Sequence, residues 1–141
     1  MIDVFNRQLG KSTEIIPRVL VVDDDPDNLL FIGYTLALLG IKYLVTESAK
    51  VALDLAMDKV PDLILLDMVM PETDGMKLAK TLKRNPLTNH IPIIAVTGLT
   101  LSEHRTAIAA AGCDDYISKP LLIDELEAKL IQYLNCNLIR I

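Results

Sequence analysis

The 141-residue chain contains no tryptophan, two phenylalanines and two cysteines, and its aromatic fraction is only 4%. A core must therefore be built from aliphatic side chains, and hydrophobic residues do make up 51% of the sequence. Two cysteines far apart neither form a disulfide framework nor have zinc-ligand spacing, so we expect reduced thiols in a cytoplasmic protein. The length fits one domain that buries its core without disulfides or structural metals.

Basic residues are in the minority, because 14 Lys and Arg stand against 19 Asp and Glu and give a net charge of −5. Binding to a phosphate backbone needs a basic footprint, so nucleic acid is not expected as a direct partner. Apolar runs fall short of the roughly 18 residues that a membrane-spanning helix needs. The N-terminus also lacks the basic start and apolar stretch of a signal peptide. We therefore expect no membrane association.

Short apolar runs alternate with amphipathic segments from Pro17 onward. Asp25 before Pro26 predicts the start of a helix, and Gly40 and Gly112 predict helix ends. Strands are expected at 19–22, 41–46, 63–66, 91–96 and 116–117, and helices at 26–39, 48–59, 74–85, 102–111 and 123–134.

Continuous apolar strands are covered on both faces, which predicts a parallel sheet with helices on each side. We expect an α/β fold of the flavodoxin-like, doubly wound type, with five strands in the order 2-1-3-4-5 and five helices. In the second helix, Val51, Leu53, Leu55 and Ala56 are expected to face inward. Residues 18–134 would form this domain, after an N-terminal arm at 1–17. An apolar tail at 135–141 would dock on the domain or on a second copy in a homodimer.

Polar side chains follow the apolar strands: Asp23 and Asp24 after the first, Asp67 after the third, Thr97 after the fourth and Lys119 after the fifth. Because the carboxyl ends of parallel strands meet at one rim, these side chains should surround one crevice. Carboxylates held this close repel one another, and Mg²⁺, which takes oxygen ligands, relieves the conflict. Asp24 and Asp67 are the best ligands, with Asp23 acting through a bound water.

A carboxylate can also attack phosphorus and form an aspartyl phosphate. Such a transfer depends mainly on positioning and on neutralising the equatorial oxygens, which Mg²⁺, Lys119 and the Thr97 hydroxyl would each contact. Taken singly, each of these residues is more often a helix cap, a turn residue or a surface residue. Their joint order at the strand ends favours a site that accepts a phosphoryl group.

Four segments carry a family resemblance: VLVVDDDPDN (19–28), PDLILLDMVMPETDG (61–75), IPIIAVTG (91–98) and AAGCDDYISKP (110–120). In this order and spacing they resemble the response-regulator receiver domains of two-component signalling, such as the single-domain chemotaxis regulator, over 18–134. The resemblance implies that Asp67 is the phosphorylated residue and that Asp23 and Asp24 are the acidic pair. Asp24 would be the direct Mg²⁺ ligand, and the backbone carbonyl of Val69 the third protein ligand.

The same resemblance implies that Lys119 pairs with the phosphoryl group, that the bond before Pro120 is cis, and that Thr97 and Tyr116 form a switch pair. In the family, inward movement of this pair rearranges the face made by the fourth helix, fifth strand and fifth helix of the domain. The implied partners are a histidine kinase or histidine phosphotransfer protein and a downstream target protein.

The sequence departs from the family pattern around the expected phosphoryl group. Gly98 follows Thr97 where the family usually has alanine. Val69 and Leu99, two residues past Asp67 and Thr97, are apolar where family members often carry polar groups. Because apolar side chains cannot orient an attacking water, we predict a comparatively long-lived phosphoryl group.

Two other functions fit the same fold. A Mg²⁺-dependent phosphohydrolase with an aspartyl-phosphate intermediate would need a second acid two residues after Asp67, where Val69 stands. A flavin- or nucleotide-binding domain would need a phosphate-cradling loop after the first strand, where the acids 23–25 repel phosphate. The leading interpretation is therefore a phosphoacceptor signalling protein that is not an enzyme.

Overall fold

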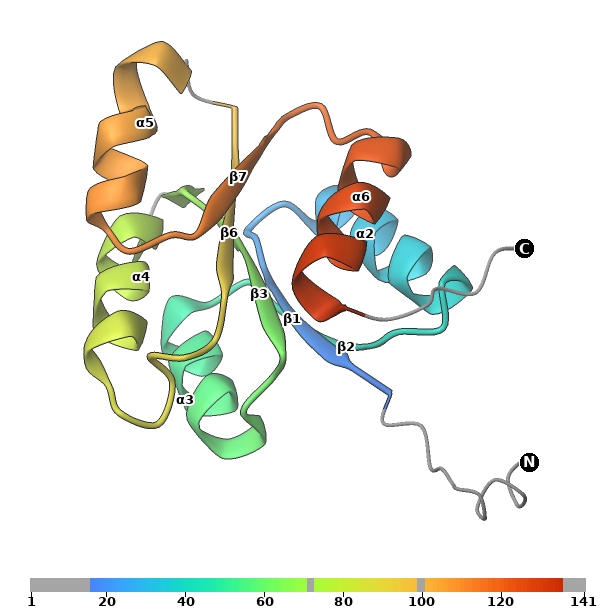
Figure 1. The fold of residues 1–141 in the computed structure, drawn as a ribbon, viewed down its shortest axis with the longest axis horizontal. Coiled ribbons are helices and arrows are strands. Elements are labelled where there is room, and N and C mark those ends of the chain that lie inside the picture. The colour runs from blue at the N-terminus through green and yellow to red at the C-terminus, as the bar shows by residue number, and fades with distance from the viewer. Residues whose placement is uncertain (1–15, 71–72, 99–100, 136–141) are drawn as a thin grey trace.

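The computed structural model describes residues 16–70, 73–98 and 101–135 (Figure 1). Its main sheet has five parallel strands in the spatial order β2-β1-β3-β6-β7. The strands are β1 (Arg18–Val22), β2 (Lys42–Thr46), β3 (Leu63–Asp67), β6 (Ile93–Thr97) and β7 (Asp115–Ser118). This is the predicted 2-1-3-4-5 order of a doubly wound sheet, and the fold class is confirmed.

Helices cover both faces of the sheet, as continuous apolar strands require (Figure 1). The described helices are α2 (Pro26–Leu38), α3 (Ala49–Lys59), α4 (Gly75–Arg84), α5 (Leu101–Ala110) and α6 (Ile123–Leu134). Two aliphatic core layers result, one under α2 and α6 and the other under α3, α4 and α5. Within the described ranges, no helix is both long and apolar enough to span a bilayer.

The predicted helix boundaries follow local chemistry. Asp25 caps α2, because its side chain accepts a hydrogen bond from the Asp27 amide at 2.9 Å and Pro26 occupies the first turn. Gly40 and Gly112 follow α2 and α5 with φ angles of 79° and 97°, a conformation that favours glycine. These positions confirm the predicted start and stop signals.

The prediction for the inner face of α3 was partly wrong. Val51 is 45% exposed, whereas Ala49, Ala52 and Ala56 are buried against the sheet. Alanines at this spacing lie on one side of a helix, and their small side chains bring its backbone close to the strands. The larger Val51 therefore lies on the solvent side of the helix.

A two-stranded antiparallel hairpin, β4 (Val69–Met70) with β5 (Thr73–Asp74), follows β3 and was not predicted. Strands of two residues are too short to produce a recognisable alternation of apolar and polar residues. Residues 1–15 and 136–141 lie outside the described part of the chain. The limits of the expected arm and tail therefore remain predictions.

Candidate functional site

The carboxyl ends of four neighbouring strands place the predicted site residues on one rim of the sheet (Figure 1). Val22 pairs with Leu66, so the next residues, Asp23 and Asp67, lie side by side. Both are almost fully buried, with exposed fractions of 1% and 3%, and Thr97 at the end of β6 is fully buried. Parallel topology alone brings these residues together, although they are far apart in the sequence.

Three carboxylates form the centre of the site. One carboxylate oxygen from each of Asp23, Asp24 and Asp67 lies within 4.8 Å of the others. Asp24 is half-buried, so the cluster opens to solvent on its side. Oxygen donors at this separation suit a hard divalent cation, which also offsets their mutual repulsion.

Asp23 is held by its neighbours in the loop after β1. Its Oδ1 accepts a hydrogen bond from the Asp25 amide at 2.9 Å, and its Oδ2 accepts one from the Asn28 side chain at 3.3 Å. Its own amide donates to the carbonyl of Thr46 on β2 at 3.1 Å. Sequence reasoning did not identify Asn28 as part of the site, although the residue ends the first motif. Its position in the first turn of α2 was the signal available.

Lys119 supplies the positive charge of the rim. Its Nζ lies 3.5 Å from Asp67 Oδ2 and 3.6 Å from Asp23 Oδ2, so one ammonium group bridges two strands. The Lys119 amide donates to the Thr97 carbonyl at 2.9 Å, which fixes the start of the loop after β7. The bond from Lys119 to Pro120 is cis, as predicted.

Thr97 and Tyr116 face the same side of the sheet. Tyr116 pairs with Ala95, and Thr97 is two residues beyond Ala95, so side-chain alternation puts all three on one face. Tyr116 is half-buried against the core layer under α5. Arg105 of α5 donates from Nη2 to the Tyr116 hydroxyl at 3.2 Å, a contact that sequence reasoning missed.

The loop after Asp67 passes directly against the first residue of α4. A Cβ atom added to Gly75 would overlap the carbonyl oxygen of Asp67 and would lie 2.9 Å from Met68 Cα. The backbone at Asp67 therefore requires glycine at this position. Val69 begins β4, and its carbonyl as a metal ligand remains a prediction. Leu99 lies outside the described residues.

The family model for the response regulator receiver domain matches residues 19–131, nearly the whole described chain. The chain belongs to the response-regulator receiver domain family. The predicted family is thereby confirmed, and the receiver fold explains why the acidic rim and Lys119 meet.

Three curated relatives resemble the chain at 35–39% identity. The polar-differentiation response regulator DivK of Brucella ovis is 35% identical over 82% of this chain and 94% of its own length. The phosphate regulon transcriptional regulatory protein PhoB of Pseudomonas aeruginosa is 39% identical over 79% of this chain and 49% of its own. A probable cyclic di-GMP phosphodiesterase of Vibrio cholerae is 37% identical over 93% of this chain. This receiver spans only 30% of that protein.

Solved receiver structures agree with the fold. The receiver domain of the sensor histidine kinase PA1611 from Pseudomonas aeruginosa has a TM-score of 0.79 at 28% identity, over 86% of this chain and 100% of that one. It was solved with a magnesium ion coordinated in its active site cleft. A response regulator receiver domain protein (CheY-like) from Methanospirillum hungatei has a TM-score of 0.79 at 27% identity, over 86% of this chain and 95% of that one.

Proposed function

We propose that this receiver is a phosphoacceptor of a two-component phosphorelay and that Asp67 accepts the phosphoryl group. The observation that carries the proposal is a buried Asp67 carboxylate with the oxygens of Asp23 and Asp24 within 4.8 Å and Lys119 Nζ 3.5 Å away. Relatives that are response regulators support the same function. The phosphoryl donor would be a phosphohistidine of a kinase or phosphotransfer protein.

The acidic cluster fits Mg²⁺ as the cofactor. Three carboxylates lie around one point while one ammonium group bridges two of them, so the described rim keeps an excess of negative charge. Asp24 and Asp67 would bind the ion directly, with Asp23 acting through water and Val69 offering a carbonyl. When bound, Mg²⁺ neutralises one oxygen of the phosphoryl group.

In the transfer, an Asp67 carboxylate oxygen forms the new bond to phosphorus while the phosphorus–nitrogen bond of the donor breaks. The electron pair of that bond stays on the imidazole nitrogen of the donor, which takes up a proton. Lys119 would shift from Asp67 to a phosphoryl oxygen, and the Thr97 hydroxyl would contact another. Movement of Thr97 would then draw the Tyr116 ring inward and change the surface of α5, β7 and α6 that faces a target protein.

Apolar side chains beside the rim support docking of a protein donor. Phe31 of α2 and Leu122 and Ile123 at the start of α6 are 38%, 61% and 52% exposed. Together with the neighbouring residues 121–125 they line one groove next to the loop that carries Lys119. Grouped apolar side chains on a surface are typical of sites where proteins bind.

The test is incubation with acetyl phosphate and Mg²⁺, followed by intact-mass measurement. The wild type should gain the mass of one phosphoryl group, and hydroxylamine should remove it, as expected for an acyl phosphate. Asp67→Asn should gain none. The matched control is Asp58→Asn, because Asp58 is an exposed acid of similar chemistry on α3 and should leave labelling unchanged. Labelling of Asp67→Asn to the wild-type level, or no labelling of the wild type, would refute the proposal.

The phosphoryl group is also proposed to be long-lived, because Val69 and Leu99 offer no polar group to an attacking water. The sequence alone supports this point. Replacing both with polar residues, as Val69→Asn with Leu99→Glu, should accelerate loss of the label. Equal rates in the variant and the wild type would contradict it.

A further inference from the structure

We propose that Arg105 is a positioning residue that holds the Tyr116 ring in the half-buried orientation of this structure and so sets how readily this receiver switches. This orientation, in which the Tyr116 hydroxyl meets Arg105, is called the outer one. Its guanidinium makes two contacts with that ring. Nη2 donates to the Tyr116 hydroxyl at 3.2 Å, and the guanidinium carbon lies 5.6 Å from the ring centroid. A cation in this position is attracted to the ring face, and the hydrogen bond fixes the hydroxyl end. The inference rests on the proposed switching role of Tyr116.

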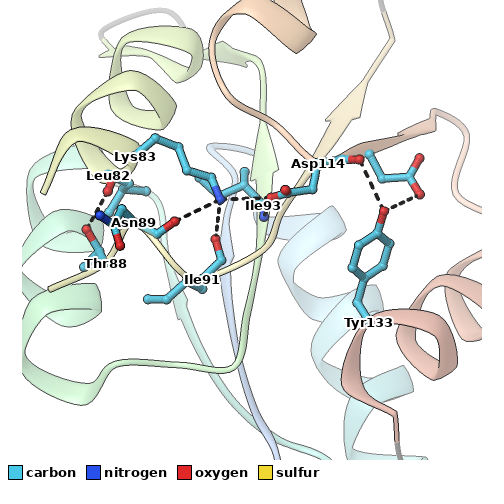
Figure 2. A network of polar contacts seen from close by, with 9 residues as sticks. Leu82, Lys83, Thr88, Asn89, Ile91, Ile93, Asp114 and Tyr133 are labelled. Atoms are coloured by element: carbon cyan, nitrogen blue, oxygen red, sulfur yellow. Dashed lines mark hydrogen bonds and ion pairs between the residues drawn. The ribbon is translucent and has the colours of Figure 1, made fainter. Parts of the chain in front are cut away.

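The strand beneath Tyr116 is fixed on its other face. The Asp115 carboxylate accepts a hydrogen bond from Lys129 at 2.8 Å and lies 3.0 Å from the Tyr133 hydroxyl, and both partners are on α6. Figure 2 shows the Tyr133 hydroxyl directed at Asp114, the residue just before β7, and the Asp114 carbonyl lies 3.2 Å from that hydroxyl. Because α6 holds the strand, Tyr116 can change position by rotating its side chain while β7 stays in place.

An inward rotation would break both contacts with Arg105. The strand neighbour of Tyr116 is Ala95, which presents only a methyl group, and Thr97 lies on the same face two residues further on. The equilibrium between the outer and inner ring positions therefore depends on how strongly Arg105 of α5 stabilises the outer position. Exposed cation–π contacts shift such an equilibrium by about two- to fivefold.

The experiment measures the ring orientation and the switch separately. Tyr116 side-chain rotamers are measured by NMR on protein with ¹³C-labelled tyrosine, without any phosphoryl donor. Binding of beryllofluoride is then titrated at saturating Mg²⁺. Arg105→Ala should increase the inner rotamer and tighten beryllofluoride binding by about two- to fivefold. Arg105→Lys, which keeps the charge, should fall between Arg105→Ala and the wild type.

Two controls separate positioning from a general structural effect. Arg84→Ala removes an exposed arginine from α4 on the same face of the sheet and should change neither readout. In a Tyr116→Ala background, Arg105→Ala should no longer alter beryllofluoride binding, because there is no ring to hold.

The inference is overturned if Arg105→Ala leaves the Tyr116 rotamers unchanged, or if its effect on binding persists in the Tyr116→Ala background. Failure of the wild type to bind beryllofluoride would instead refute the proposed function. The rotamer measurement would still decide the role of Arg105.

Discussion

The two ends of the sheet both use aspartate and lysine, but they balance charge differently. At the carboxyl ends of the strands, three clustered carboxylates share the ammonium group of Lys119, at 3.5 and 3.6 Å from two of them. At the opposite end, Lys83 pairs with Asp114 at 3.0 Å and Lys129 pairs with Asp115 at 2.8 Å. The acidic cluster thus carries surplus negative charge, whereas the opposite end carries these two ion pairs, each of them neutral, and is called the neutral end for that reason.

At the neutral end, the Lys83 and Asp114 side chains also hydrogen-bond to backbone groups. Lys83 donates to the Ile91 carbonyl at 2.8 Å and to the Asn89 carbonyl at 3.4 Å, and Asp114 Oδ2 accepts from the Ile93 amide at 2.8 Å (Figure 2). These bonds join the end of α4, the start of β6 and the loop before β7. Charge-assisted hydrogen bonds to backbone groups are among the stronger polar contributions to stability.

The contrast separates a structural use of charge from a functional one. Balanced pairs lower the free energy of the folded chain, whereas packed like charges raise it until a ligand arrives. Residues that lower stability in the free protein are expected at binding sites, because they interact favourably with the ligand once it is bound. The following changes test this difference, from the largest expected effect to the smallest.

Gly75→Ala should be the most damaging change at the acidic rim, although it alters no charge. The new Cβ would overlap the Asp67 carbonyl, which is backbone and cannot rotate away. We expect a loss of about 3 kcal/mol in the free energy of unfolding, measured by urea denaturation, together with weakened Mg²⁺ binding.

Gly98→Ala is the matched control for Gly75→Ala. Among the residues that the structure describes, a Cβ at Gly98 would meet only Lys119 Cβ, at an ordinary contact distance of 4.0 Å. This variant should stay within about 0.5 kcal/mol of the wild type. Equal losses in the two variants would show that close approach to Asp67 is not the cause.

The sequence predicted the rim of the site but not the contacts that support it. Apolar runs and helix caps were enough to place Asp23, Asp67, Thr97 and Lys119 at strand ends, and parallel strands bring such ends together. This inference needed only the order of elements along the chain, so it did not depend on side-chain distances.

Contacts between residues that are far apart in the sequence leave no comparable pattern in the sequence itself. The approach of Gly75 to Asp67 and the contact of Arg105 with Tyr116 depend on how helices lie against strands. Val51 was expected to face inward with the other apolar residues of α3, yet the spacing of the small alanines decides which side of the helix faces the sheet. Hydrophobicity predicted the elements, whereas close packing determined their finer orientation.

Asp114→Ala should have the largest effect at the neutral end. It removes the acceptor of the Ile93 amide and leaves Lys83 without its ion-pair partner. The expected loss is about 1–2 kcal/mol in the free energy of unfolding. Asp58→Ala is the control, because Asp58 pairs with Lys59 at 3.6 Å on an exposed surface and should change stability by less than about 0.5 kcal/mol. If both variants lost the same amount, the backbone hydrogen bond would not matter.

Asp24→Asn should raise the stability of the protein, whereas the changes above lower it. Removing one charge from the cluster relieves repulsion, so the Mg²⁺-free protein should gain about 0.5–1 kcal/mol in the free energy of unfolding. The stabilisation that added Mg²⁺ gives the wild type should shrink at the same time. Thermal denaturation with and without Mg²⁺ measures both effects.

Asp27→Asn is the control for Asp24→Asn, because it removes a charge from the first turn of α2, where negative charge is favourable. It should lower stability slightly and leave the response to Mg²⁺ intact. A gain in stability from both variants would mean that overall negative charge, and not the cluster, is responsible.

The smallest expected effect is the pH dependence of the stability that the Asp115 carboxylate contributes. Partial burial alone would raise the pKa of this carboxyl, but hydrogen bonds from Lys129, the Tyr116 amide and Tyr133 together lower the pKa below its ordinary value of 3.8. A carboxyl with a lowered folded-state pKa stabilises the protein above its unfolded-state value and loses that contribution as the pH falls. The stability difference between wild type and Asp115→Asn, about 0.5 kcal/mol near neutral pH, should therefore shrink below about pH 4. Urea denaturation from pH 7 to pH 3 measures it, and a difference that stays constant would show that the charge of Asp115 does not contribute.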